Sequence, residues 1–282
     1  MKLKCPILSE GYMLEEPRVL TFHSGGVLSL DLHPHNQNLI ASGSMDSSVA
    51  ISDLSSRENL PLCMLSDHKK FVVRVKWSPS GLYLVTASYD KTFCVYKYSV
   101  ENQTAVKIEQ FETQNSIEGL AFKNFSDEFI VSLRNNNYLL HFKIEQDVCW
   151  EIRKINMNEI GDDHVSFNAM DISFSPKDNF ILVSTDRQHA ILIEGSSGKV
   201  IGNHYGFLGN ELSQPRHCWH PSGLYFYETC EDKSINVVSV YDQKVVHKLL
   251  GHTQLVRYLS YSIYHNVLIS SSFDGSVHLW KC

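Results

Sequence analysis

Fourteen histidines and a recurring aspartate are the side chains of this 282-residue chain that could serve as metal ligands or as general acids and bases. The densest group is the run Arg216-His217-Cys218-Trp219-His220. Successive side chains of a strand point to opposite faces, so we expect His217 and His220 to diverge. The run therefore predicts no metal site, and we expect no cofactor.

An acidic residue returns in a turn-like segment along the whole chain. The series is Asp46, Asp90, Asn136 in place of an acid, Asp186, Asp232 and Asp274. Spacings of 44, 46, 50, 46 and 42 residues distribute these side chains one per repeat, so they cannot pair as a general acid and base. Walker loops, nucleophile elbows and HExxH sequences do not occur, and Gly195-Ser-Ser-Gly198 is typical of a turn between two strands. We therefore expect a protein that is not an enzyme.

Charge and composition narrow the class of partner. The chain has 25 Lys and Arg against 31 Asp and Glu, a net charge of −6, which disfavours nucleic acid as the main partner. Seven dispersed cysteines without a C-x-x-C pair indicate neither a disulfide framework nor a zinc site. Neither an apolar run of membrane-spanning length nor a signal peptide is found. We expect no membrane association and a location in the cytoplasm, the nucleus or both.

The elements that must position these side chains form an internal repeat. The segment Trp77-Ser-Pro-Ser-Gly-Leu-Tyr83 returns as Trp219-His-Pro-Ser-Gly-Leu-Tyr225, six matches in seven, at an offset of 142 residues. Pro34 and Pro176 hold the same place in other copies. Six repeats of roughly 47 residues fill the chain. We therefore expect a single domain over residues 1–282, with residues 1–12 as a flexible tail.

Each repeat has a β pattern. Apolar residues alternate with period two in VLSLDLHP and VVRVKWSP, and further apolar runs follow in NLIASGS and VAISDL. A fourth, more variable strand is expected in NLPLCML, AVKIEQF, CWEIRKI, KVIGNHY and KVVHKLL. Four short strands per repeat is the period of a β-propeller blade.

The last repeat, LLGHTQLVRYLSYSIYHNVLISSSFDGSVHLW, resembles a WD repeat almost position for position. The family pattern is Gly-His, then Ser or Thr, then a turn Asp, then Trp-Asp. The last repeat supplies Gly251-His252, Ser270 or Ser272, Asp274 and Trp280. The second supplies Asp67-His68, Thr86 or Ser88, Asp90, and Tyr96 at the tryptophan position, and the first keeps His23 and Asp46. Repeats three to five are degenerate, with Thr113 and Asn210 near the histidine position and Phe142, Leu192 and Val238 at the tryptophan position.

The resemblance implies an all-β WD-repeat propeller of six blades. It also implies a structural hydrogen-bonded tetrad in the well-kept blades, carried here by His68, Asp90, His252, Asp274 and Trp280. The last repeat ends after its third strand, so we expect Glu16–Phe22 to complete that blade and close the ring. The alternatives are a seventh blade hidden between Ile108 and Met170, or an open ring completed by a strand from a partner.

The resemblance also implies where partners bind. Recurrent contact positions in WD-repeat proteins are the residue before the turn Asp and those three and five places after the histidine. The pre-Asp set transferred here is Met45, Tyr89, Asn135, Thr185, Glu231 and Phe273. We expect one apolar sector of the upper rim, formed by Met45, Phe71, Tyr89, Leu255, Arg257 and Phe273. The alternative is that some of these side chains fold into the channel as core.

The resemblance favours a non-catalytic scaffold that binds other proteins through the upper face, as a monomer within a hetero-complex. The alternative is a reader of peptides or histone tails at the channel mouth, where Glu118 and Glu231 would take a Lys or Arg side chain.

Overall fold

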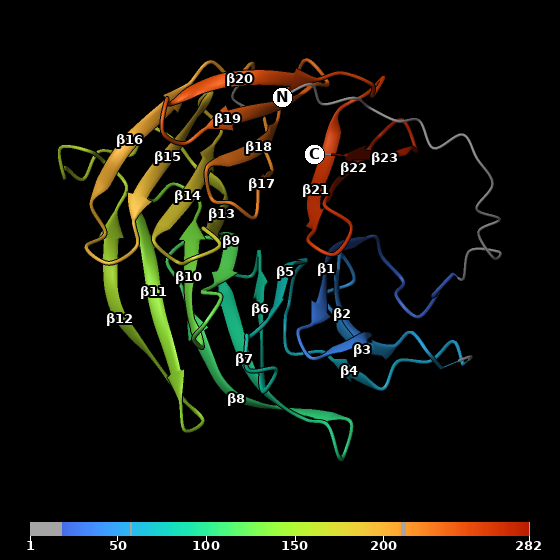
Figure 1. The fold of residues 1–282 in the computed structure, drawn as a ribbon. Helices are drawn as coiled ribbons and strands as arrows, with labels where there is room; N and C mark the ends of the chain where they lie inside the picture. Colours follow the sequence, from blue (N-terminus) through green and yellow to red (C-terminus); the bar gives the residue numbers. More distant parts are fainter. Residues whose placement is uncertain (1–18, 57, 210–212, 282) are drawn as a thin grey trace. The chain divides into compact units, whose positions relative to one another are not determined.

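The computed structural model describes residues 19–281 except residue 57 and residues 210–212. The described residues form strands and turns without a helix, so no helix there is long and apolar enough to cross a membrane. Six antiparallel sheets follow one another along the chain, one for each repeat (Figure 1). The protein is therefore all-β, with a six-blade β-propeller arrangement. Two compact units divide at Asn156 and Met157, and each holds three blades.

The amino-terminal unit contains blades 1 to 3. Blade 1 consists of β1 (Val27–His33), β2 (Asn36–Ser44), β3 (Val49–Asp53) and β4 (Cys63–Leu65). Blade 2 consists of β5 (Val72–Trp77), β6 (Tyr83–Ser88), β7 (Thr92–Ser99) and β8 (Thr104–Glu112). Blade 3 consists of β9 (Ile117–Phe122), β10 (Glu128–Leu133), β11 (Tyr138–Glu145) and β12 (Val148–Asn156).

The carboxy-terminal unit contains blades 4 to 6. Blade 4 consists of β13 (Ala169–Phe174), β14 (Phe180–Thr185), β15 (His189–Glu194) and β16 (Val200–Tyr205). Blade 5 consists of β17 (His217–Trp219), β18 (Tyr225–Thr229), β19 (Ile235–Ser239) and β20 (Lys244–Leu249). Blade 6 consists of β21 (Val256–Ser262), β22 (Val267–Ser272) and β23 (Val277–Lys281). The turn predicted at Gly195–Gly198 joins β15 to β16, which confirms that prediction.

Within each unit the core lies between neighbouring blades. In the amino-terminal unit Ile51 of blade 1 and Val75 and Tyr96 of blade 2 belong to one buried cluster, and Phe93 and Phe129 join blades 2 and 3 in another. The middle strands are covered on both faces, so all six residues of β6 are buried. The outer strand β8 alternates between exposed and half-buried residues instead. This difference explains why the middle strands are near-continuous apolar runs whereas the outer strands are variable.

Two predictions about blade number have different outcomes. Residues 108–170 contain β9–β12 between the end of β8 and the start of β13, so the hidden seventh blade was wrong: the stretch has room for one sheet. Blade 6 has three strands among the described residues. Residues 19–22 of the segment expected to complete it are not in a strand, while residues 16–18 and the tail 1–12 lie outside the described residues. Closure by an amino-terminal strand stays a prediction.

Candidate partner-binding faces

A hydrogen-bonded turn network holds the β22–β23 turn of blade 6. His252 Nδ1 lies 3.0 Å from Asp274 Oδ2, and His252 Nε2 lies 2.8 Å from Ser270 Oγ. The indole N–H of Trp280 donates to the same Ser270 Oγ at 2.8 Å. Asp274 also accepts from the Thr253 amide at 2.9 Å, which ties the loop before β21 to this turn. Of the two hydroxyls that the sequence allowed, the structure selects Ser270.

The same arrangement recurs in blades 1 and 2. His68 Nδ1 lies 3.2 Å from Asp90 and its Nε2 2.8 Å from Thr86, and His23 lies 3.1 Å from Asp46. Tyr96 departs from the tryptophan pattern, because its hydroxyl donates to Asp67 at 2.9 Å rather than to Thr86.

One member of the network escaped the sequence analysis. In blades 1, 2 and 6 the hydroxyl two residues after the turn Asp donates to that carboxylate, at distances of 2.5 to 2.6 Å from Ser48, Thr92 and Ser276. Each of these three hydroxyls also lies 3.0 to 3.2 Å from the histidine Nδ1 of its own blade. The signal was present in the sequence as a Ser or Thr at the second place after the Asp of these three blades.

The electrostatics of blade 2 fix the charge states of this network. Burial lowers the pKa of His68, against the attraction of the Asp90 charge, so the imidazole is neutral at pH 7. Burial alone would raise the pKa of Asp90, but hydrogen bonds from Thr92 and the Lys69 amide outweigh it and hold the pKa below its usual value. A neutral imidazole that donates to Asp90 accepts at its other nitrogen from Thr86. The turn is thus fixed by a carboxylate without a buried cation.

One backbone bond defines a pre-turn residue in each of the six blades, including those without the histidine network. The amide of Tyr89 donates to the Phe71 carbonyl at 3.1 Å, and that of Phe273 donates to the Leu255 carbonyl at 3.1 Å. This bond holds the pre-turn residue beside the loop that precedes the first strand of the same blade. The pre-turn residues defined in this way are Met45, Tyr89, Arg134, Asp186, Glu231 and Phe273.

Two of the positions transferred from the family were wrong by one residue. Blade 3 uses Arg134, not Asn135, because the Arg134 amide bonds to the Ser116 carbonyl and Asn135 already has the positive φ of the turn. Blade 4 uses Asp186, not Thr185. Asp186 lies two residues before the positive-φ Gln188, as Phe273 lies two before Gly275. The sequence misplaced both because it took Asn136 and Asp186 as the turn residues, whereas the positive-φ residues of these two turns are Asn135 and Gln188.

In blades 1 to 4 and 6 a β-bulge next to the pre-turn bond orients a further side chain. In blade 6 the pairing passes from Val256–Ser272 to Tyr258–Ser271, so Arg257 is the extra residue. Glu118 holds the corresponding place in blade 3 and Val73 in blade 2. An extra residue bends its strand and re-aims its side chain. The position five places after the histidine is therefore set by the bulge.

The face of the amino-terminal unit is apolar and partly charged. Met45 is 42% exposed and Phe71 39%, and the Phe71 ring lies 6.5 Å from that of Tyr89. Glu118 is buried, with Tyr89 Oη and Arg134 Nη1 each 3.4 Å from its carboxylate. Met45 and Phe71 are thus surface side chains rather than core, while Glu118 already has a cation beside it.

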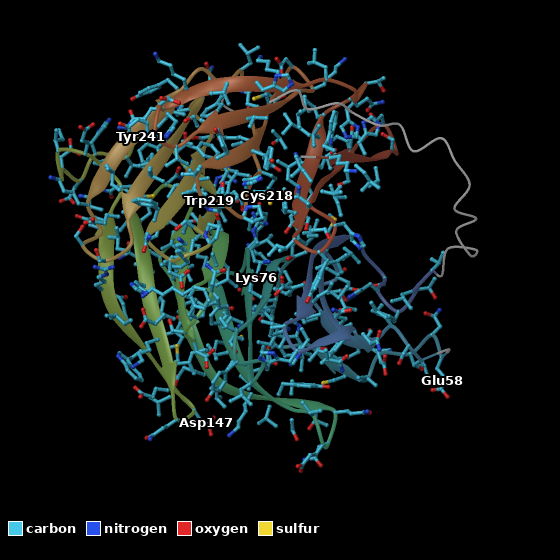
Figure 2. All side chains as sticks on the ribbon, viewed as in Figure 1. Glu58, Lys76, Asp147, Cys218, Trp219 and Tyr241 are labelled. Atoms are coloured by element: carbon cyan, nitrogen blue, oxygen red, sulfur yellow. The ribbon has the colours of Figure 1, made fainter. Side chains whose placement is uncertain are left out.

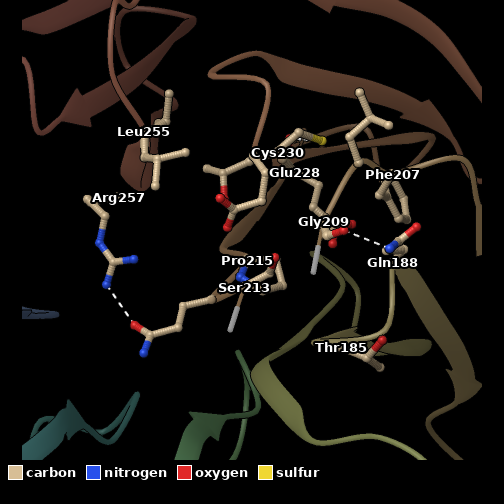
Figure 3. Close-up of a pocket in the computed structure, with 15 residues that line it drawn as sticks. Thr185, Gln188, Phe207, Gly209, Ser213, Pro215, Glu228, Cys230, Leu255 and Arg257 are labelled. Atoms are coloured by element: carbon tan, nitrogen blue, oxygen red, sulfur yellow. Dashed lines mark hydrogen bonds between the residues drawn. The ribbon is translucent and has the colours of Figure 1, made fainter. Parts of the chain in front are cut away.

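The face of the carboxy-terminal unit pairs an arginine with an aromatic ring. The Arg257 guanidinium lies 5.1 Å from the centroid of the Phe273 ring, which is 61% exposed, and it donates to Gln214 Oε1 at 2.8 Å. A hollow adjoins this pair and is lined by Leu255, Arg257 and Glu231 among other residues (Figure 3). Because Met45, Phe71 and Tyr89 belong to the other unit, the single sector expected for all six residues stays a prediction.

The histidines of the candidate ligand run have separate surroundings. His217 is buried and lies between Ser173 Oγ at 2.6 Å and Ser184 Oγ at 2.7 Å. His220 instead lies 2.8 Å from Ser222 Oγ at the end of β17, the strand that carries the adjacent Cys218 and Trp219 (Figure 2). No group of three or more His, Cys, Asp or Glu in the described part of the chain is placed to hold a metal ion.

The comparison with protein families agrees with the repeat. Residues 14–53, 59–97 and 243–281 match the family model of the WD domain, G-beta repeat. These three segments are the first, second and last repeats, whose histidine and aspartate form the turn networks described above. The chain thus contains three segments that match WD repeats, within a six-blade β-propeller arrangement.

Several named proteins are similar to parts of the chain, which range from 27% to 90% of its length. WD repeat-containing protein 62 of Sus scrofa is 22% identical over 255 residues, 90% of this chain and 16% of that protein. Pre-mRNA-processing factor 19 of Oryza sativa subsp. japonica is 36% identical over 76 residues, 27% of this chain and 14% of that protein. One of the subunits of chromatin assembly factor 1 of Mus musculus is 31% identical over 97 residues, 34% of this chain and 16% of that protein. The chain thus spans 16% of the length of the first of these relatives.

Proposed function

We propose that this protein is a non-catalytic scaffold that binds other proteins through the ends of the blades that carry the pre-turn residues. The observation that carries the proposal is the exposure of large apolar side chains there, with Met45, Phe71 and Phe273 all at or above 39%. Aromatic rings, methionine and arginine are the residue types enriched in protein interfaces. Arg257 beside Phe273 adds a cation that can pair with a partner carboxylate.

The names of the similar proteins support the role in assemblies. They refer to a subunit of a chromatin assembly factor, a pre-mRNA-processing factor and a subunit of a transcription initiation factor. By analogy we infer for this chain a place as one copy within a hetero-complex, in the nucleus, the cytoplasm or both. The net charge of −6 supports protein rather than nucleic acid as its partner.

The reader of cationic tails is the second candidate. A role for Glu118 in binding a cationic tail is disfavoured, because Arg134 and Tyr89 already contact its carboxylate. Glu231 favours the same role, because this acid lines the hollow of the carboxy-terminal unit.

Affinity capture from the source cells tests the scaffold with substitutions on each face. We expect Phe71→Ala and Phe273→Ala to lose stoichiometric partners while the melting temperature changes little, since both rings are exposed. The matched control is Tyr241→Ala, which removes a 91% exposed ring from the β19–β20 turn, at the opposite end of its blade from the pre-turn residue (Figure 2). Capture that survives both face substitutions, or that falls equally with Tyr241→Ala, contradicts the proposal.

A further inference from the structure

A buried carboxyl group without a hydrogen-bond partner for one of its oxygens lies in the wall of the hollow in the carboxy-terminal unit. Glu228 of β18 is 1% exposed, and its Oε2 has no hydrogen-bond partner. Leaving a buried polar atom unpaired costs stability, so such an atom needs an explanation. Figure 3 shows Glu228 in the lining of the hollow, between Phe207 and Arg257.

Among the described residues that line the hollow, one positive and one negative group balance without Glu228. Arg257 is positive and donates to Gln214, and Glu231 is the other acid among the described lining residues. The Glu231 charge favours the charged form of Arg257, against burial and the Arg216 charge, which lower its pKa. Burial raises the pKa of Glu228 to about 8, so this carboxyl is protonated at pH 7.

The groups around Glu228 act in both directions on its pKa, and burial dominates. Asp171 of β13 raises its pKa further, and a hydrogen bond from Ser184 of β14 acts in the opposite direction. His217 of β17 contacts Ser184 at 2.7 Å, and Arg216 lies 3.7 Å from the carboxylate of Asp171. Cys230 comes directly after β18. Burial raises the pKa of its thiol to about 12, so the thiol is neutral at pH 7.

We propose that this hollow binds a lysine or arginine side chain presented by a partner protein, and that Glu228 ionises to balance the incoming charge. A second cation beside Arg257 would leave one positive charge in excess, and Glu228 is the described lining carboxyl still able to lose a proton. Apolar walls from Phe207 and Leu255 suit the methylene stem of such a side chain. The inference rests on the proposed function, since the cation comes from a bound protein.

If cation binding requires Glu228 to lose its proton, the affinity for the cation must depend on pH in a defined direction. A ligand that binds the ionised form must release the Glu228 proton at any pH below about 8. Affinity should therefore rise with pH by up to about tenfold per unit between pH 6 and pH 8, and level off above that range.

The test uses small probes and the whole chain, so it needs no partner. N-acetyl-arginine amide is titrated against the protein by calorimetry and NMR, with N-acetyl-citrulline amide as an uncharged probe of the same shape. We expect saturable binding of the arginine probe with a Kd on the order of millimolar, with the pH dependence above, and weaker binding of the citrulline probe. Equal binding of the two probes, or an affinity that does not change with pH, overturns the inference.

Two variants assign the effect to the carboxyl groups. Glu228→Gln keeps the shape and the neutral state of the folded protein, so it should fold, yet it should weaken the arginine probe by about tenfold or more and abolish the pH dependence. Glu231→Gln should weaken binding but keep the pH dependence. Probe affinity unchanged by Glu228→Gln overturns the inference even where partner capture succeeds. Probe binding lost in Glu228→Gln supports the site even where capture fails.

Discussion

Blades 2 and 5 have chemically different side chains at the same position, three residues before the pre-turn residue. In blade 2, Thr86 lies three residues before the pre-turn Tyr89 and hydrogen-bonds to His68. In blade 5 the corresponding residue, three before Glu231, is Glu228, whose Oε2 has no hydrogen-bond partner. A hydroxyl in this position completes a polar network, whereas a carboxyl is too strongly desolvated to stay charged. Blade 5 therefore has a buried titratable carboxyl where blade 2 has a stabilising hydrogen-bond network.

Blades 3 and 4 show a third solution. The corresponding residues are Val131 and Val183, both fully buried in apolar surroundings. Apolar packing then replaces the network, so these blades need no histidine. Blade 5 is therefore unusual among the degenerate blades, because it alone of the three keeps a titratable group at this position.

The largest effect should come from replacing Glu228 with a neutral side chain that cannot ionise. An unfolded glutamate has a pKa near 4.5, and the folded chain raises that of Glu228 to about 8. Protonation therefore stabilises the fold fully below pH 4.5, and this contribution is lost as the pH rises toward 8. Glu228→Gln should raise the free energy of unfolding at pH 7 by about 3 kcal/mol relative to the parent chain. Urea unfolding of both proteins at pH 5 and pH 8 measures this difference in the free energy of unfolding.

Glu118→Gln is the matched control for that experiment. Glu118 is another buried carboxyl, but it contacts Arg134 and Tyr89, so its substitution should not stabilise the protein. If the difference between the parent chain and Glu228→Gln is the same at both pH values, Glu228 does not hold a proton in the folded chain.

The next effect concerns the turn aspartates. Asp90→Ala should cost about 1–3 kcal/mol, because it leaves His68, Thr92 and the Lys69 amide without their shared acceptor. Asp274→Ala should lower the melting temperature in the same way. Asp232→Ala should cost less, since Asp232 accepts from Ser234 and from the partly exposed Lys248. Equal melting shifts for Asp274→Ala and Asp232→Ala would contradict the idea that the histidine network is what matters.

A smaller effect is expected at the tryptophan position of blade 2. Tyr96→Phe removes the hydroxyl that donates to Asp67 and should cost about 1 kcal/mol. Lys107→Met serves as a control, because it removes the exposed ion pair of Asp67 at 2.6 Å and should change stability less. Thermal melts of the two variants decide the order.

The smallest effect should appear in blade 1. Ser52 holds the tryptophan position there, and its buried hydroxyl has no hydrogen-bond partner. Ser52→Ala should therefore leave stability unchanged or raise it by up to about 1 kcal/mol. A clear loss of stability on denaturation would show that this hydroxyl makes a contact important to the blade.

The sequence by itself determined the repeat, the strand order of the blades and the turn networks of blades 1, 2 and 6. These features depend on local spacing: a histidine, a hydroxyl and an aspartate at fixed intervals can satisfy one another within a single blade. Period-two alternation likewise predicted the strands, because each side chain's face follows from its place in the chain.

The tertiary structure alone decided the features that depend on strand register within a blade or on packing between neighbouring blades. The bulge at Arg257, the one-residue shift to Arg134 and Asp186, and the partners of Tyr96 arise from the pairing register, which short degenerate repeats leave open. Glu228 is the clearest case, because in sequence it is an ordinary polar residue of a strand. Its burial comes from the packing of blades 4, 5 and 6 around it, and burial rather than residue type makes it protonated.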